Sequence, residues 1–219
     1  MLESLTPKKE RHAVVRLSAV SDANVERLLN RGINPESFPE IQGRLRKLKI
    51  VFEPTQLIDK VFEPNTNPKH PTPFAKSRFT NGDKAVFYSA LEDETSIEEI
   101  KYHQTRSGEF NDLENIANAP PRYFRLYETD FDGTMLDLFT IHSNCPELTS
   151  ANESGYPKCR QLADEARSSS INAFRTPSAR RSGGTCTPVF DRQSLGDIFR
   201  LKRRGRFTNE DGKIVFREV

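Results

Sequence analysis

The sequence lacks the features that cross-link many proteins or anchor them in a membrane. Its 219 residues include no tryptophan and three cysteines, Cys145, Cys159 and Cys186. This sparse, odd set is a poor disulfide framework, and no C-x-x-C pair or regular histidine spacing suggests a structural zinc site. No apolar run approaches the ~20 residues that cross a bilayer, and the polar amino terminus lacks the apolar core of a secretory signal. We therefore expect a cytoplasmic protein with no metal and no membrane contact.

Hydrophobic residues are also scarce, at 35% of the chain against 29% charged residues. The 15 phenylalanines and 5 tyrosines still allow an apolar core. The net charge of +2 hides an uneven distribution, because residues 90–137 contain twelve acidic and four basic side chains, whereas residues 160–219 contain thirteen basic and seven acidic ones. Such a basic region is either a solvated surface or a surface that meets phosphate groups.

The hydrophobic pattern predicts many short strands and few helices. Strands are expected at residues 13–20, 85–91, 123–127, 135–141, 172–174, 188–190, 197–201 and 214–216. Helices are expected at about 21–32, at about 96–106 and at about 157–168. Thr95 and Glu98 have the spacing of a capping box, in which Thr95 caps the helix and Glu98 reaches back to its backbone N–H. These elements favour an α+β fold with a central, mostly antiparallel sheet and flanking helices.

Prolines divide the chain. Seven of them fall between residues 34 and 73, where they favour extended loops and short pieces over long helices. We place a boundary near residue 65. Residues 1–65 are expected to form an N-terminal extension that packs on the core, and residues 66–219 the main domain.

The common phosphate-binding and nucleophile motifs are absent, including G-x-x-x-x-G-K-[ST], G-x-G-x-x-G and G-x-S-x-G. Candidates for chemistry remain in three segments, at residues 77–82, 87–99 and 172–184. The basic stretch at residues 200–206 could contact nucleic acid, but the apolar Phe199 and Leu201 favour a strand with a solvated face.

These three segments, in this order, resemble the RES domain family, whose members are typically the toxins of bacterial toxin–antitoxin pairs. The resemblance covers roughly residues 70–195. It rests on Arg78-Phe79 with Gly82, on Tyr88, on the helix start at residues 95–99, and on Pro177-Ser178-Ala179-Arg180. It implies a split sheet similar to that of ADP-ribosyltransferases, and it makes residues 66–219 an NAD-binding catalytic domain.

The resemblance implies Glu99, Arg78, Tyr88 and Ser178 as catalytic residues. An ionised Glu99 would hold the ribose hydroxyls and offset the positive charge of an oxocarbenium-like centre. If Glu98 completes the capping box, Glu99 is free to project about 100° further around the helix. Without the resemblance, Glu99 would be an ordinary first-turn acid favoured by the helix dipole.

The other implied residues would bind the substrate. Arg78 would grip phosphate oxygens in a bidentate way, and Arg180 would make a second phosphate contact. Tyr88 would offer a flat face to the nicotinamide ring, and Ser178 a hydrogen bond to phosphate or ribose. Phe79 is a further substrate contact, although a place in the core is the alternative for both Phe79 and Tyr88.

The implied substrate is NAD, and three acceptors remain open. Water would make the protein a glycohydrolase, inorganic phosphate a phosphorylase, and a protein acceptor an ADP-ribosyltransferase. We favour NAD depletion with water or phosphate, and the arginines near Ser178 favour phosphate. His103, four residues after Glu99, could serve proton transfer or make a simple surface contact.

Partners follow from the same resemblance. It implies a small helical Xre-like antitoxin, encoded beside this chain, and an oligomer formed with it. The competing class is a non-enzymatic protein that binds nucleic acid through the basic C-terminal third.

Overall fold

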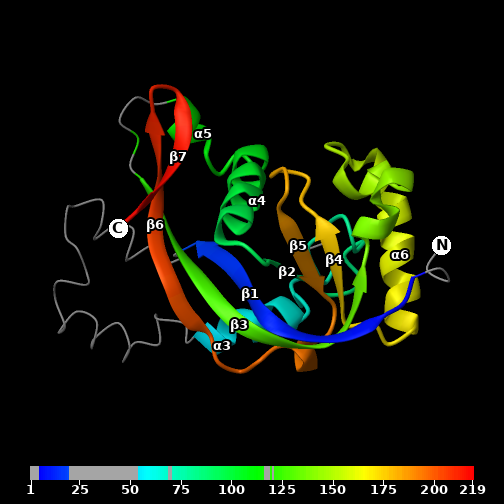
Figure 1. Ribbon diagram of the computed structural model, residues 1–219. Helices are drawn as coiled ribbons and strands as arrows, with labels where there is room; N and C mark the ends of the chain where they lie inside the picture. Colours follow the sequence, from blue (N-terminus) through cyan, green and yellow to red (C-terminus); the bar gives the residue numbers. More distant parts are fainter. Residues whose placement is uncertain (1–4, 20–53, 69–70, 116–118, 120) are drawn as a thin grey trace.

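The computed structural model describes residues 5–19, 54–68, 71–115, 119 and 121–219. In this part of the chain, seven strands form one sheet in the order β1-β2-β5-β4-β3-β6-β7, and β1 also pairs with β3. The pairing of β1 with β3 closes five strands into a barrel, from which β6 and β7 extend to one side (Figure 1).

The barrel is surrounded by a few helices. The strands are β1 (Lys8–Ala19), β2 (Phe87–Ala90), β3 (Arg122–Asp137), β4 (Ala173–Pro177), β5 (Thr185–Val189), β6 (Arg200–Glu210) and β7 (Lys213–Glu218). The α-helices are α3 (Pro54–Phe62), α4 (Asp93–Arg106), α5 (Asn111–Asn115) and α6 (Tyr156–Ser168). Short 3-10 helices are η3 (Phe139–Asn144), η4 (Pro146–Thr149), η5 (Glu153–Gly155) and η6 (Arg192–Ser194). Helix α4 packs against β1, β2 and β5, and so faces the edge where these strands meet.

The mixed fold class and the mostly antiparallel sheet are confirmed. Each strand pairing is antiparallel except that of β3 with β4. The sheet differs from the expected split sheet because β1 lies along β3 from Lys8, opposite Met135, to Ala19, opposite Phe124. It also meets β2 at Val15. Long strands twist enough to reach two neighbours, and this twist closes the sheet into a barrel.

Strand β3 replaces two predicted strands, those at residues 123–127 and 135–141. The charged stretch between them continues the strand because its side chains alternate: Thr129 and Phe131 are buried, whereas Asp130 faces outward and pairs with an arginine of β6. The end of the second predicted strand turns into η3 instead.

Most of the remaining predicted elements that fall on described residues are confirmed with shifted ends, but of the strand predicted at residues 197–201 only Arg200 and Leu201 lie in β6. Helix α6 matches its prediction closely, β1 begins five residues before residue 13, and the short C-terminal strands become β4, β5, β6 and β7. The helix predicted at about 21–32 lies outside the described residues. The boundary near residue 65 stays a prediction; within the predicted extension, β1 is itself a strand of the barrel.

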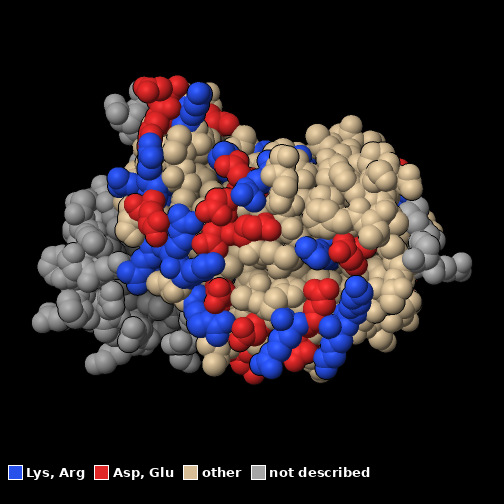
Figure 2. Space-filling view, in the orientation of Figure 1, with Lys and Arg blue, Asp and Glu red and all other residues tan. Residues whose placement is uncertain are grey.

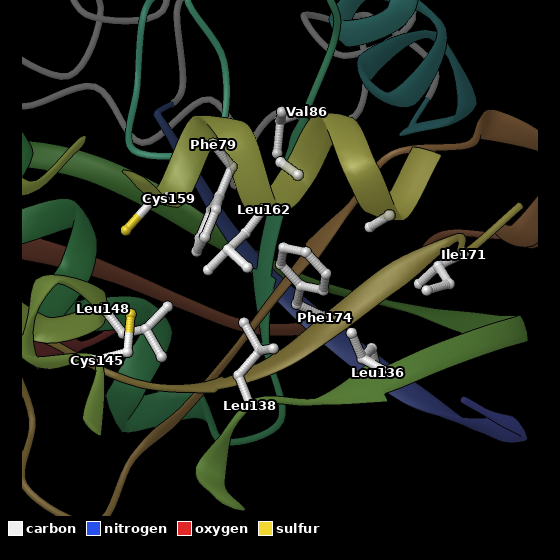
Figure 3. Packing of buried hydrophobic residues seen from close by; sticks show 12 residues of the cluster. Phe79, Val86, Leu136, Leu138, Cys145, Leu148, Cys159, Leu162, Ile171 and Phe174 are labelled. Atoms are coloured by element: carbon white, nitrogen blue, oxygen red, sulfur yellow. The ribbon is translucent and has the colours of Figure 1, made fainter. Parts of the chain in front are cut away.

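The apolar core of the described residues falls into three clusters, of which one fixes the segment before β2. In this cluster α6 covers β4, and Leu162 of α6 and Phe174 of β4 pack with Phe79 (Figure 3). The rings of Phe79 and Phe174 meet edge to face, with centroids 5.5 Å apart. Phe79 therefore ties the segment that carries Arg78 to the core.

Candidate active site

A cavity of about 850 Å³ lies between α4, the adjoining ends of β1, β2 and β5, and the segment before β2. Its volume falls in the range of sites that hold small organic ligands. Five of the six predicted site residues line it: Arg78, Phe79, Tyr88, Glu99 and Arg180. The sixth, Ser178, contacts Glu99. The fold thus brings together residues that are up to about a hundred positions apart in the sequence.

Helix α4 begins earlier than the capping box predicts, so that prediction is wrong. Its N-cap is Glu92, whose Oε2 accepts hydrogen bonds from the Thr95 hydroxyl at 2.6 Å and from the Thr185 backbone N–H at 2.8 Å. Glu98 forms an ion pair with Lys101 instead. The contact with Thr185 comes from β5, a partner that no local pattern shows. This link between the helix start and the sheet sets the direction in which the next turn of α4 projects.

The two carboxylate oxygens of Glu99 have different surroundings. Oε1 accepts a hydrogen bond from Ser178 Oγ at 2.6 Å and another from Cys186 Sγ at 3.3 Å. Burial and the neighbouring carboxylate raise the pKa of the Cys186 thiol, so the thiol stays protonated and can donate. Oε2 lies 4.0 Å from His103 Nε2, and 24% of the Glu99 side chain is exposed. Oε2 is therefore the oxygen that a ligand in the cavity can reach.

Ser178 holds the Glu99 carboxylate without lining the cavity itself. Its hydroxyl oxygen accepts hydrogen bonds from the backbone N–H groups of Arg180 at 3.0 Å and Arg181 at 3.1 Å, while its proton is directed at Glu99. The residue is 8% exposed. We predicted a contact from Ser178 to phosphate or ribose. In this arrangement its hydroxyl is instead engaged in orienting the carboxylate.

Arg78 is anchored on the opposite wall. Its two terminal nitrogens donate to the backbone carbonyls of Glu147 and, at 2.8 Å, of Ser150, and its guanidinium lies 4.8 Å from the ring centroid of Tyr156. A guanidinium carries five N–H groups, so three remain for other acceptors. The predicted role of Arg78 as a phosphate ligand therefore rests on these three groups.

Gly82 closes the turn after Arg78 and provides a stability prediction. Its φ is +94°, and an added β-carbon would lie 2.7 Å from Thr72 Cβ and 2.8 Å from the Phe74 carbonyl oxygen. Gly183 also has a positive φ, +74°, but faces open space. Alanine at either position costs about 1 kcal/mol for the backbone conformation. Gly82→Ala should lower the free energy of unfolding by about 1–3 kcal/mol more than Gly183→Ala, because only Gly82 is crowded. Urea unfolding measures both variants, and equal losses would contradict the crowding argument.

Arg16 of β1 lines the same cavity, and we did not predict it. Its Nη1 donates to the Tyr88 carbonyl at 3.0 Å, and its guanidinium lies 4.8 Å from the ring centroid of Phe87. Among the described residues, no carboxylate forms an ion pair with it. Burial lowers the pKa of Arg16 to about 10, so the group is still charged at neutral pH. The sequence offers one sign of this role, because Arg16 is the single basic residue in the mostly apolar stretch at residues 13–20.

Further cations surround the end of the cavity near Glu99. The Arg180 guanidinium stacks 3.3 Å from the ring centroid of Tyr102, and its buried Nε has no hydrogen-bond partner among the described residues. Desolvation lowers the pKa of His103, Glu99 opposes this shift, and Arg180, Arg106 and Arg78 add to it. The imidazole is thus neutral at pH 7, and the guanidinium groups around it favour an anionic ligand.

The basic stretch at residues 200–206 lies in β6, so its interpretation as a strand is confirmed. Its charges alternate with acidic side chains over this face of the protein (Figure 2). Arg200 pairs with Asp130, Lys202 with Asp93, and Arg203 with Glu94. Cations that are paired with carboxylates attract a nucleic-acid backbone only weakly. This pairing weighs against the alternative that the protein binds nucleic acid through its basic C-terminal third.

Among the described residues, no group of three or more His, Cys, Asp or Glu side chains is placed to hold a metal ion, and Cys145, Cys159 and Cys186 are free thiols. No helix in this part of the chain combines the length and apolar character needed to span a membrane.

Comparison with known protein families gives a match to the RES domain. A model of the RES domain matches residues 54–208, a span that contains α3, the Arg78 turn, Tyr88, Glu99 and Ser178. Comparison with curated proteins finds no match. The matched span covers more than half of the chain and holds the cavity residues except Arg16 and Leu17 of β1, which precede it. The chain therefore belongs to the RES domain family.

Proposed function

We propose that the protein cleaves the bond between nicotinamide and ribose in NAD. The observation that carries this proposal is the Glu99 carboxylate, which Ser178 and Cys186 hold by one oxygen while the other is open to a cavity lined by arginines. Bond cleavage gives the ribose carbon an oxocarbenium-like positive charge. A carboxylate fixed in advance stabilises such a charge without having to reorganise. Membership of the RES domain family fits this chemistry.

The reaction needs few groups from this chain. Nicotinamide leaves with the bonding electron pair, which neutralises its ring nitrogen, so no general acid is required. Glu99 offsets the charge left on the ribose, and an acceptor oxygen then forms the new bond to the ribose carbon. Arg16 and Arg78 would hold the two phosphates through charge-assisted hydrogen bonds, which are the strong ones in proteins.

Inorganic phosphate is the acceptor that we propose. Arg78, Arg106 and Arg180 all lie close enough to His103 to shift its pKa. Arg106 is paired with Glu153, so among the described residues the uncompensated positive charge of this cluster comes from Arg78 and Arg180. A dianion is attracted to such a cluster more strongly than neutral water, and it brings its own nucleophilic oxygen.

The acceptor can be identified from the products. Purified protein is incubated with NAD in the presence and absence of inorganic phosphate, and the products are identified by mass spectrometry. We expect nicotinamide and phosphorylated ADP-ribose when phosphate is present. ADP-ribose in both conditions would make water the acceptor, and ADP-ribose attached to protein would make the enzyme a transferase. NAD left intact in every condition, with candidate protein acceptors included, would overturn the proposal.

In the cell we propose that this activity makes the protein a toxin controlled by an Xre-like antitoxin. Expression of the wild-type chain should then arrest growth as cellular NAD falls, and co-expression of the product of the adjacent reading frame should restore both. Growth arrest without a fall in NAD would separate toxicity from the proposed chemistry.

A further inference from the structure

The Tyr88 hydroxyl contacts the residues on both sides of Arg78. It donates a hydrogen bond to Ser77 Oγ at 2.6 Å and accepts one from the Phe79 backbone N–H at 3.2 Å. The Tyr88 ring stacks on the Phe79 ring, with centroids 6.4 Å apart. Tyr88 thus fixes the backbone at the position from which the Arg78 side chain extends.

Helix α6 holds the same turn from the other side. Arg160 Nε donates to the Ser77 carbonyl at 3.0 Å, and Arg167 donates to the Phe79 carbonyl at 3.2 Å. The polar backbone groups that flank Arg78 are therefore satisfied by β2 and α6 together. Of these partners, only Tyr88 also lines the cavity.

The hydroxyl has little capacity left for a ligand or for proton transfer. Burial raises the pKa of the Tyr88 phenol well above its ordinary value, so it stays protonated across the working range of pH. Its proton is directed at Ser77, and one lone pair receives the Phe79 N–H.

We propose that Tyr88 is a positioning residue that acts through its hydroxyl on Arg78. The hydroxyl holds the Arg78 backbone so that the guanidinium reaches the Glu147 and Ser150 carbonyls and presents its remaining N–H groups to the cavity. That these groups meet a phosphate of the substrate rests on the proposed function. The restraint on Arg78 does not rest on it.

Kinetics of Tyr88→Phe test the proposal, because this variant keeps the ring and loses only the hydroxyl. Arg78 would bind substrate and transition state alike, so KM for NAD should rise about tenfold, as for one lost hydrogen bond, with kcat little changed. The effect should vanish in an Arg78→Ala background, since the hydroxyl acts through Arg78. Tyr127→Phe is the control, because Tyr127 is also a buried tyrosine but lies outside the cavity. Wild-type kinetics for Tyr88→Phe, or an equal effect with and without Arg78, would overturn the proposal.

A spectroscopic measurement separates this proposal from the proposed function. In the wild type, NMR should show distinct, slowly exchanging Nη–H signals for Arg78 and a protected Phe79 amide. In Tyr88→Phe the Arg78 signals should average and the Phe79 amide should exchange faster, while Tyr127→Phe should match the wild type. Unchanged signals in Tyr88→Phe would overturn the positioning role even if NAD is cleaved. The expected changes in a protein that leaves NAD intact would support it and count against the proposed function alone.

Discussion

Replacing Glu99 with glutamine should lower kcat for nicotinamide release by about 10²–10³-fold, the size of effect seen when one preorganised electrostatic group is removed from an active site. Glutamine keeps the shape of the side chain but loses the negative charge that offsets the oxocarbenium-like ribose. KM for NAD should change little, because the arginines that hold the phosphates are intact. Steady-state kinetics of nicotinamide release measure both quantities.

Glu98→Gln is the matched control for this experiment. Glu98 is the preceding residue on α4, and its carboxylate pairs with Lys101 rather than with the groups that hold Glu99. The control should retain wild-type kcat. Equal losses in Glu98→Gln and Glu99→Gln would show that the helix, and not the Glu99 carboxylate, was damaged.

Replacing Arg16 with glutamine should raise KM for NAD by about 10- to 100-fold, as expected for the loss of a hydrogen bond between charged groups. Arg16 has no carboxylate partner among the described residues, so an anionic ligand is the natural counterion for its partly buried charge. Nicotinamide riboside has no phosphate, so the wild type and the variant should cleave it at the same rate. Kinetics with both substrates measure the contrast.

Arg11→Gln provides the control on the same strand, because Arg11 is exposed and does not line the cavity. It should behave as the wild type with both substrates. If Arg16→Gln impairs NAD and nicotinamide riboside equally, then Arg16 supports the fold of the cavity rather than a phosphate.

Much of the local structure was predictable because it depends on short-range patterns. The strand before Leu91 and the helix that ends near Gly108 follow from apolar spacing and a helix stop. Glu99 was predicted correctly to lie on that helix although the predicted cap was wrong, because an earlier helix start moves Glu99 from the first turn toward the middle of α4 and leaves it within the helix.

What the sequence did not show depends on contacts between distant segments. The barrel closes because β1 pairs with β3, more than a hundred residues away, and no local pattern records that register. Arg16 enters the cavity as a result of this closure. Likewise, the hydrogen bond from Ser178 to Glu99 joins residues 79 positions apart. The sequence predicts that Ser178 contacts a ligand, whereas in the structure its hydroxyl orients the Glu99 carboxylate.

Free nicotinamide released from NAD by the purified protein is the most direct test of the proposed chemistry. The wild type, incubated with NAD and inorganic phosphate, should release nicotinamide in an amount that matches the NAD consumed, and the Glu99→Gln protein should release almost none over the same time. NAD that stays intact with the wild type, with and without phosphate and protein acceptors, would contradict the account.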